Sequence, residues 1–142
     1  MKYTIPALLL ALLSTSAAYA DAAHVSRVDL FATCIASQNQ KQKKWMPNLY
    51  TPSQLEQLDP FQLKSISESC ACTVKEAFES LSQGTIQAFN TSMKEGVGDI
   101  IPSKTKASME FQKAGMTDKQ IACKEQSLKS SGLSEQIKKL SK

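Results

Sequence analysis

Residues 59–84, DPFQLKSISESCACTVKEAFESLSQG, decide how this sequence is expected to fold. The pair Asp59-Pro60 is typical of a helix start, because proline tolerates the first turn and aspartate can cap free amides. Gly84 suits the left-handed turn that closes a helix. Between them, apolar residues recur every three or four positions: Leu63, Ile66, Cys70, Val74, Ala77 and Leu81. This spacing predicts one long helix with a continuous apolar face.

The helix carries two cysteines one residue apart, Cys70 and Cys72. Successive helical residues are about 100° apart, so these two thiols point to nearly opposite sides. A bond between them is disfavoured, because disulfide geometry is hard to meet across one intervening helical residue. Of the three ways to pair four cysteines, two remain. Cys34–Cys70 can combine with Cys72–Cys123, or Cys34–Cys72 with Cys70–Cys123, and the spacing does not choose between them.

Residues 1–20 have the composition of a secretory signal peptide. Lys2 supplies positive charge, residues 5–13 form an apolar run, and Ala18 and Ala20 are small residues where a signal peptidase reads. The run is too short for a membrane-spanning helix. We therefore expect cleavage after Ala20, which leaves residues 21–142 as a soluble periplasmic or secreted domain with no transmembrane segment. In an oxidising compartment, four cysteines predict two disulfides.

The rest of the mature chain is also helical in pattern. A first helix is expected from a Ser26 cap to Pro47, apolar in its first half and polar in its second. Residues 51–54 have a capping-box pattern that starts a short helix, which is expected to end at Asp59-Pro60. Later helices are expected after Thr85, Ser103 and Thr117, with a last one over residues 133–140. No strand-like alternation occurs. The predicted fold is all-α: a single compact domain of about five to six helices with two disulfides.

No known catalytic or cofactor-binding motif is found in the sequence, so we expect a protein that is not an enzyme and holds no cofactor or metal. The single histidine, His24, lies near the expected mature N-terminus, where no neighbouring group would hold it as a base. Two carboxylate pairs, Glu76 with Glu79 and Glu56 with Asp59, have the spacing of ordinary solvated helix faces.

Two segments are candidate partner-binding sites. The first is a basic run ending in aromatic residues: Lys41, Lys43, Lys44, Trp45 and Tyr50. Such a segment can engage an anionic partner, or its lysines can keep the helix end solvated while Trp45 covers the core. The second is a loop that presents Val97, Ile100 and Ile101. Its apolar side chains can contact a partner or fill the edge of the core.

These features favour a non-enzymatic protein that binds another protein or an envelope component. Removal of Lys2 with residues 1–20 lowers the formal net charge from +4 to +3, which does not indicate a nucleic-acid partner. A small crosslinked domain suits an inhibitor or immunity protein directed against a toxin or a cell-wall hydrolase. The alternatives are a periplasmic stress chaperone, and a copper or other metal carrier that uses the Cys70 and Cys72 thiolates.

Overall fold

The computed structural model describes residues 24–96, 101 and 104–141, and within these ranges the chain is helical with no strand. The predicted all-α class is confirmed. Six α-helices and one short 3₁₀-helix follow in order: α1 Arg27–Trp45, η1 Met46–Asn48, α2 Pro52–Ser80, α3 Gln83–Lys94, α4 Lys106–Lys113, α5 Met116–Ser130 and α6 Leu133–Leu140. The expected signal peptide lies outside the described residues.

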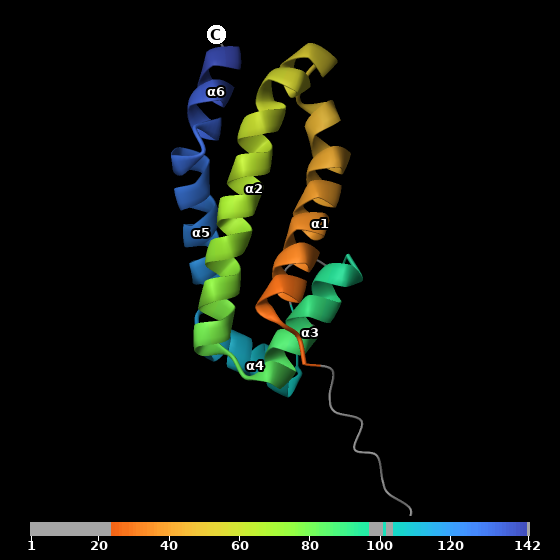
Figure 1. The fold of residues 1–142 in the computed structure, drawn as a ribbon, viewed down its shortest axis with the longest axis vertical. Coiled ribbons are helices and arrows are strands. Elements are labelled where there is room, and N and C mark those ends of the chain that lie inside the picture. The colour runs from red at the N-terminus through yellow and green to blue at the C-terminus, as the bar shows by residue number, and fades with distance from the viewer. Residues whose placement is uncertain (1–23, 97–100, 102–103, 142) are drawn as a thin grey trace, which may run out of the picture.

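Helix α2 is the central element of the fold (Figure 1). It contacts α1 on one side and α5 and α6 on the other, while α3 and α4 lie across the end opposite the α1–α2 turn. One disulfide joins Cys34 of α1 to Cys70, and the other joins Cys72 to Cys123 of α5. The prediction that the two thiols of α2 reach different neighbours is confirmed. The sequence left two pairings open, and the structure has Cys34–Cys70 with Cys72–Cys123.

The expected break at Asp59-Pro60 is wrong, because α2 runs through Pro60 without ending. The helix begins at Pro52, and Thr51 and Gln54 form the predicted capping box. Pro60 removes one backbone donor, which would otherwise bond the carbonyl of Glu56. Both residues are exposed, so water can satisfy that carbonyl. Leu58 and Gln62, on either side of the proline, are buried, and their packing favours a continuous helix.

The expected end of this helix at Gly84 is also wrong. Helix α2 ends at Ser80, Leu81 is extended, and Gly84 lies inside α3. The expected Thr85 cap is therefore one turn too late, since Ser82 is the N-cap of α3. Leu81 is buried, and its extended backbone lets the chain turn into α3 while the side chain stays in the core.

Two later helix starts also differ from expectation. Ser103 lies outside the described residues, and the cap of α4 is Thr105, which forms a capping box with Ser108. Thr117 does not cap α5, because this helix already begins at Met116 after Gly115 in the left-handed conformation. The last helix, α6, is present as predicted.

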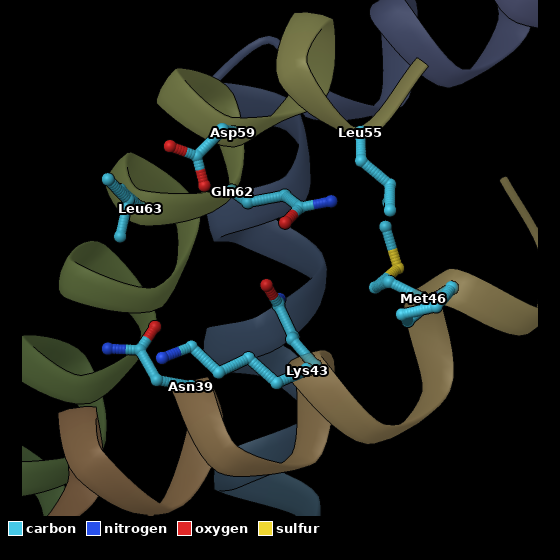
Figure 2. A pocket seen from close by; sticks show the side chains of 9 residues that line it. Asn39, Lys43, Met46, Leu55, Asp59, Gln62 and Leu63 are labelled. Atoms are coloured by element: carbon cyan, nitrogen blue, oxygen red, sulfur yellow. The ribbon is translucent and has the colours of Figure 1, made fainter. Parts of the chain in front are cut away.

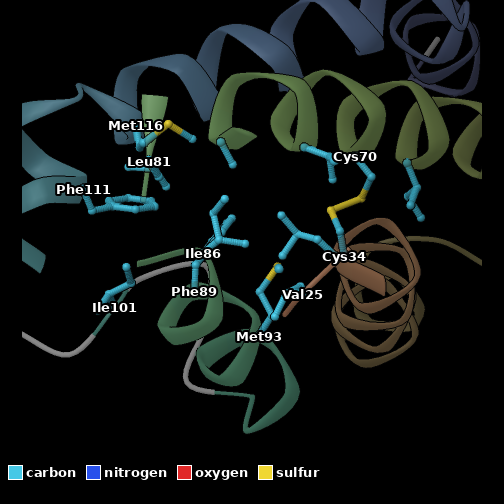
Figure 3. Packing of buried hydrophobic residues seen from close by; sticks show 14 residues of the cluster. Val25, Cys34, Cys70, Leu81, Ile86, Phe89, Met93, Ile101, Phe111 and Met116 are labelled. Atoms are coloured by element: carbon cyan, nitrogen blue, oxygen red, sulfur yellow. A yellow bond between two sulfur atoms is a disulfide. The ribbon is translucent and has the colours of Figure 1, made fainter. Parts of the chain in front are cut away.

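The apolar core lies at the end of the molecule where α3 and α4 meet the central helix (Figure 3). It consists of Val25, Leu30, Cys34, Ile66, Cys70, Val74, Ala77, Leu81, Ile86, Phe89, Met93, Ile101, Phe111 and Met116. Leu63 was expected on the same buried face, but it is 52% exposed. It lies beyond this core, toward the α1–α2 turn, where the second half of α1 offers polar residues.

The start of α3 is capped from a distant helix. Glu110 of α4 accepts hydrogen bonds from the Ser82 backbone N–H (2.6 Å), the Ser82 hydroxyl (2.8 Å) and the Thr85 hydroxyl. The Thr85 hydroxyl, followed by the two Ser82 donors, lowers the pKa of Glu110 below its usual 4.5. The ionised carboxylate therefore fixes the junction between α3 and α4.

Replacement of Pro60 by alanine should raise the free energy of unfolding by about 2 kcal/mol, because the Glu56 carbonyl regains its donor. Pro52→Ala is the matched control, since a proline in the first helical position has no such bond to restore. Urea unfolding of the two variants tests this. An unchanged or lowered stability of Pro60→Ala contradicts it.

Glu110→Gln should lower stability in a pH-dependent way. Because the folded pKa is lowered, the contribution of the carboxylate is present above the unfolded pKa and is lost as the pH falls through the folded pKa. The difference in free energy of unfolding between wild type and Glu110→Gln should be largest near neutral pH and shrink in acid. Urea titrations across this range measure it, with the exposed Glu125→Gln as control. A difference that does not vary with pH argues against this role.

Candidate functional site

A cleft opens between α1 and α2 beside the turn that joins them (Figure 2). Its volume is about 400 Å³. Nine side chains line it: Asn39, Gln42, Lys43, Met46, Pro47, Leu55, Asp59, Gln62 and Leu63. They come from the second half of α1, from η1 and from the first half of α2.

The sequence explains why the two helices leave a space here. The second half of α1, residues 38–44, reads QNQKQKK and has no apolar side chain to fill the gap. On α2, Gln62 stands where the apolar stripe would continue, four residues before Ile66. Ser65 and Ser69, also buried, turn toward this polar region and α5, where the Ser65 and Ser127 hydroxyls are 3.2 Å apart. Close apolar packing of α1 against α2 therefore stops near the Cys34–Cys70 bridge.

Gln62 is the most unusual residue of the cleft. Its side chain is 7% exposed, yet its amide Nε2 has no hydrogen-bond partner. A buried donor without a partner costs about 1–3 kcal/mol. Figure 2 shows the amide pointing from α2 into the space between the helices. Gln62 thus carries a buried donor that the described protein residues do not use.

The walls of the cleft differ in chemistry from end to end. Met46 and Leu55 face each other across the end toward which the Gln62 amide points (Figure 2). Asp59 and Leu63 lie on α2 at the other side of Gln62 in this view. Lys43 of α1 and Asp59 are the charged side chains among the nine, and their formal charges cancel.

Next to the cleft is the hairpin tip, which we define as Lys43, Lys44, Trp45, Leu49 and Tyr50. Trp45 is 65% exposed and Leu49 is 69% exposed, whereas Tyr50 is partly buried. The suggestion that Trp45 covers the core is therefore wrong. Lys43 and Lys44 have a structural role, because they lie in the last turn of α1, where positive charge interacts favourably with the helix dipole. The exposure of Trp45 has no such explanation.

The other predicted binding residues are Lys41, Val97, Ile100 and Ile101. Lys41 lies on α1 close to the tip and is partly buried. Val97 and Ile100 fall outside the described residues. Ile101 is buried in the apolar core, on the same side as Phe111 in Figure 3, so the prediction that it is presented to a partner is wrong. It fills the edge of the core, at the opposite end of the molecule from the tip.

The four cysteines and one of the paired carboxylates, Glu76, have structural partners. All four cysteines are in disulfides, so a carrier that uses the Cys70 and Cys72 thiolates would first require reduction of both bonds. Among the described residues, no group of three or more His, Cys, Asp or Glu side chains could hold a metal ion. Glu76 pairs with Lys119 at 3.1 Å, between α2 and α5.

His24 is exposed and lines a second cavity of about 390 Å³ at the start of α1. Asp29 also lines this cavity, but its carboxylate accepts hydrogen bonds from the Ser26 side chain and backbone in a capping box. Those bonds, the side-chain one above all, lower the pKa of Asp29. A lowered pKa keeps this carboxyl ionised, which suits a cap and not an acid catalyst.

The sequence does not predict the cleft, because the residues that line it belong to three separately predicted elements. The one available signal was a polar residue, Gln62, in register with an apolar face. Within the ranges that the structure covers, no helix is both long and apolar enough to span a membrane. Comparison of the chain with protein families, with curated proteins and with solved structures gives no match.

Proposed function

We propose that this chain is an exported, non-enzymatic protein whose hairpin tip docks on another protein. The observation that carries the proposal is the exposure of Trp45, at 65%, next to Leu49, at 69%, on a crosslinked hairpin. Tryptophan is among the residues that most often dominate binding energy at protein interfaces. An inhibitor or immunity protein against a toxin or a cell-wall hydrolase is the form of this function that the chain suits best.

Rigidity supports an inhibitory role. The tip joins α1 and α2, which the Cys34–Cys70 bridge holds together, and the Cys72–Cys123 bridge holds α2 against α5. A surface fixed in this way loses little conformational entropy when it binds. Lys43 and Lys44 add positive charge beside the two apolar side chains, which favours an acidic partner and faster association.

The compartment is part of the proposal. Disulfides form and persist in exported proteins, and residues 1–20 have the charge and apolar pattern of a signal peptide. A periplasmic location agrees with both features.

Intact-mass analysis of the exported protein should then give a chain that begins at Asp21 with two disulfides.

Trp45→Ala and Leu49→Ala should each weaken partner binding by about tenfold or more, because each removes apolar area from the contact. The matched control is Val28→Ala, since Val28 is also exposed, at 75%, but lies at the other end of α1. The measurement is a pull-down from periplasmic extract at native salt. A defined protein should be retained by wild type and Val28→Ala and lost with Trp45→Ala.

Trp45 is the single tryptophan, so its fluorescence reports on the tip alone. Quenching by acrylamide should be strong in the free protein and reduced in the complex with the retained protein. Retention that is the same for all three variants contradicts docking at the tip. Retention of many unrelated unfolded proteins favours the chaperone alternative.

A further inference from the structure

A shallow groove also lies between α1 and α2, at the opposite end of these helices from the tip. Its volume is about 250 Å³. The first turns of α1 and the second half of α2 supply the side chains that line it: Arg27, Val28, Phe31, Ala71, Val74 and Lys75. Four of the six are apolar, two are basic and none is acidic. We call this feature the basic groove.

The floor of the basic groove is part of the folded core, whereas its rim is open to solvent. Val74 is 6% exposed and belongs to the apolar core, and Phe31 packs against that core. The Cys34–Cys70 bridge joins the two helices next to these residues. At the rim, Val28 is 75% exposed. The floor is therefore fixed before a ligand arrives, which lowers the entropy cost of binding.

The two cations of the groove are accessible, and they come from different helices. Arg27 of α1 and Lys75 of α2 are both exposed. Within the described ranges neither forms an ion pair, although Glu79 lies one turn beyond Lys75 on α2. The Arg27 guanidinium lies 5.1 Å from the centre of the Phe78 ring, and this cation–π contact positions the side chain without neutralising its charge. The groove thus presents two positive charges beside an apolar surface.

Size and charge indicate which occupant fits. Sites that enclose a whole small ligand usually measure about 300–1,000 Å³. An open groove of about 250 Å³ suits a single apolar side chain better. Two cations are also few for a membrane, because anionic lipid surfaces are typically recognised by clusters of roughly four to eight Lys or Arg residues. Arginine beside aromatic and aliphatic side chains is typical of protein interfaces, and two cations are complementary to carboxylates.

We propose that the basic groove docks an acidic peptide segment of a partner protein. An apolar side chain of the segment contacts Val28 and Phe31, and carboxylates on either side of it contact Arg27 and Lys75. This surface is distinct from the tip, because it lies at the start of α1 and the tip lies at its end. The chain therefore has a second protein-binding surface, and neither surface requires the other.

The probe is a pentapeptide with a central leucine, glutamate at the other four positions, and acetylated and amidated ends. Two comparison peptides have glutamine in place of glutamate, or serine in place of leucine. Binding is followed by NMR of the backbone amides of the oxidised, mature protein. The probe should shift amides of residues 27–31 and 71–75 saturably and bind at least about fivefold more tightly than either comparison peptide. Its affinity should fall as salt is raised from about 0.05 to about 0.5 M, because exposed charges are screened.

Variants test the contribution of each side chain. Arg27→Gln and Lys75→Gln should each lower the affinity for the probe about threefold or more and reduce its salt dependence, since each removes one cation. The matched control is Lys129→Gln, which removes the same charge from an exposed position on α5. Val28→Ala should also weaken binding, whereas Ile121→Ala, from a side chain 50% exposed on α5, should not. Circular dichroism checks that each variant stays folded.

The tip also carries lysines beside an apolar side chain, so Trp45→Ala separates the two surfaces. This variant should bind the probe like wild type. Shifts confined to the tip, or binding lost in Trp45→Ala and kept in Lys75→Gln, overturn the assignment to the groove. Equal binding of either comparison peptide, or shifts in the groove with phosphatidylglycerol vesicles but not with the probe, overturns the acidic peptide as its occupant. Failure of docking at the tip is seen only in the pull-down, so the two proposals fail independently.

Discussion

The opposite directions of Cys70 and Cys72 on one helix are the constraint on which the rest of this structure depends. Each sulfur reaches a different neighbour, so α1 and α5 are fixed to α2 on two sides. In the chain-entropy model, loops of this length contribute roughly 4 kcal/mol each, on the scale of the stability of a whole small domain. A single intervening residue, Ala71, therefore sets the layout of three helices. A spacing of three or four would have placed both thiols on one face and left one neighbour without a crosslink.

This crosslinking explains how a domain of this size can leave half of a helix interface polar. The apolar cluster lies at the α3–α4 end, and the Cys34–Cys70 bridge belongs to it. Beyond that bridge, α1 presents glutamines, asparagine and lysines, and α2 presents buried Gln62, Ser65 and Ser69. Such an interface contributes little apolar burial. The bridge holds the two helices together nonetheless, and the cleft is the space that remains.

The sequence predicts those features that depend on local pattern. Helix class, the caps at Ser26 and Thr51 and the divergent cysteines all follow from spacing within a few residues. The pairing of Cys34 did not follow, because both candidates lie on the same helix and the choice depends on which side α1 packs. The sequence also does not predict that Glu110 caps α3, since Ser82 and Thr85 are more than twenty positions away from it in the chain. The predicted helix break at Pro60 is wrong for a related reason. Burial of Leu58 and Gln62 favours a continuous helix, and this outweighs the local preference of proline for a helix start.

The continuity of α2 through Pro60 also determines the candidate site. The proline lies between Leu55 and Leu63, so the part of α2 that lines the cleft lacks one backbone hydrogen bond, the one to the Glu56 carbonyl. Segments with few apolar contacts and a missing backbone bond open at lower free energy than a packed core. The cleft and the tip thus lie at the end of the molecule that has the least apolar packing, beyond the cluster to which the Cys34–Cys70 bridge belongs. Because that bridge and the Cys72–Cys123 bridge keep α1 and α5 against α2, the position of the tip depends on the crosslinks more than on the core.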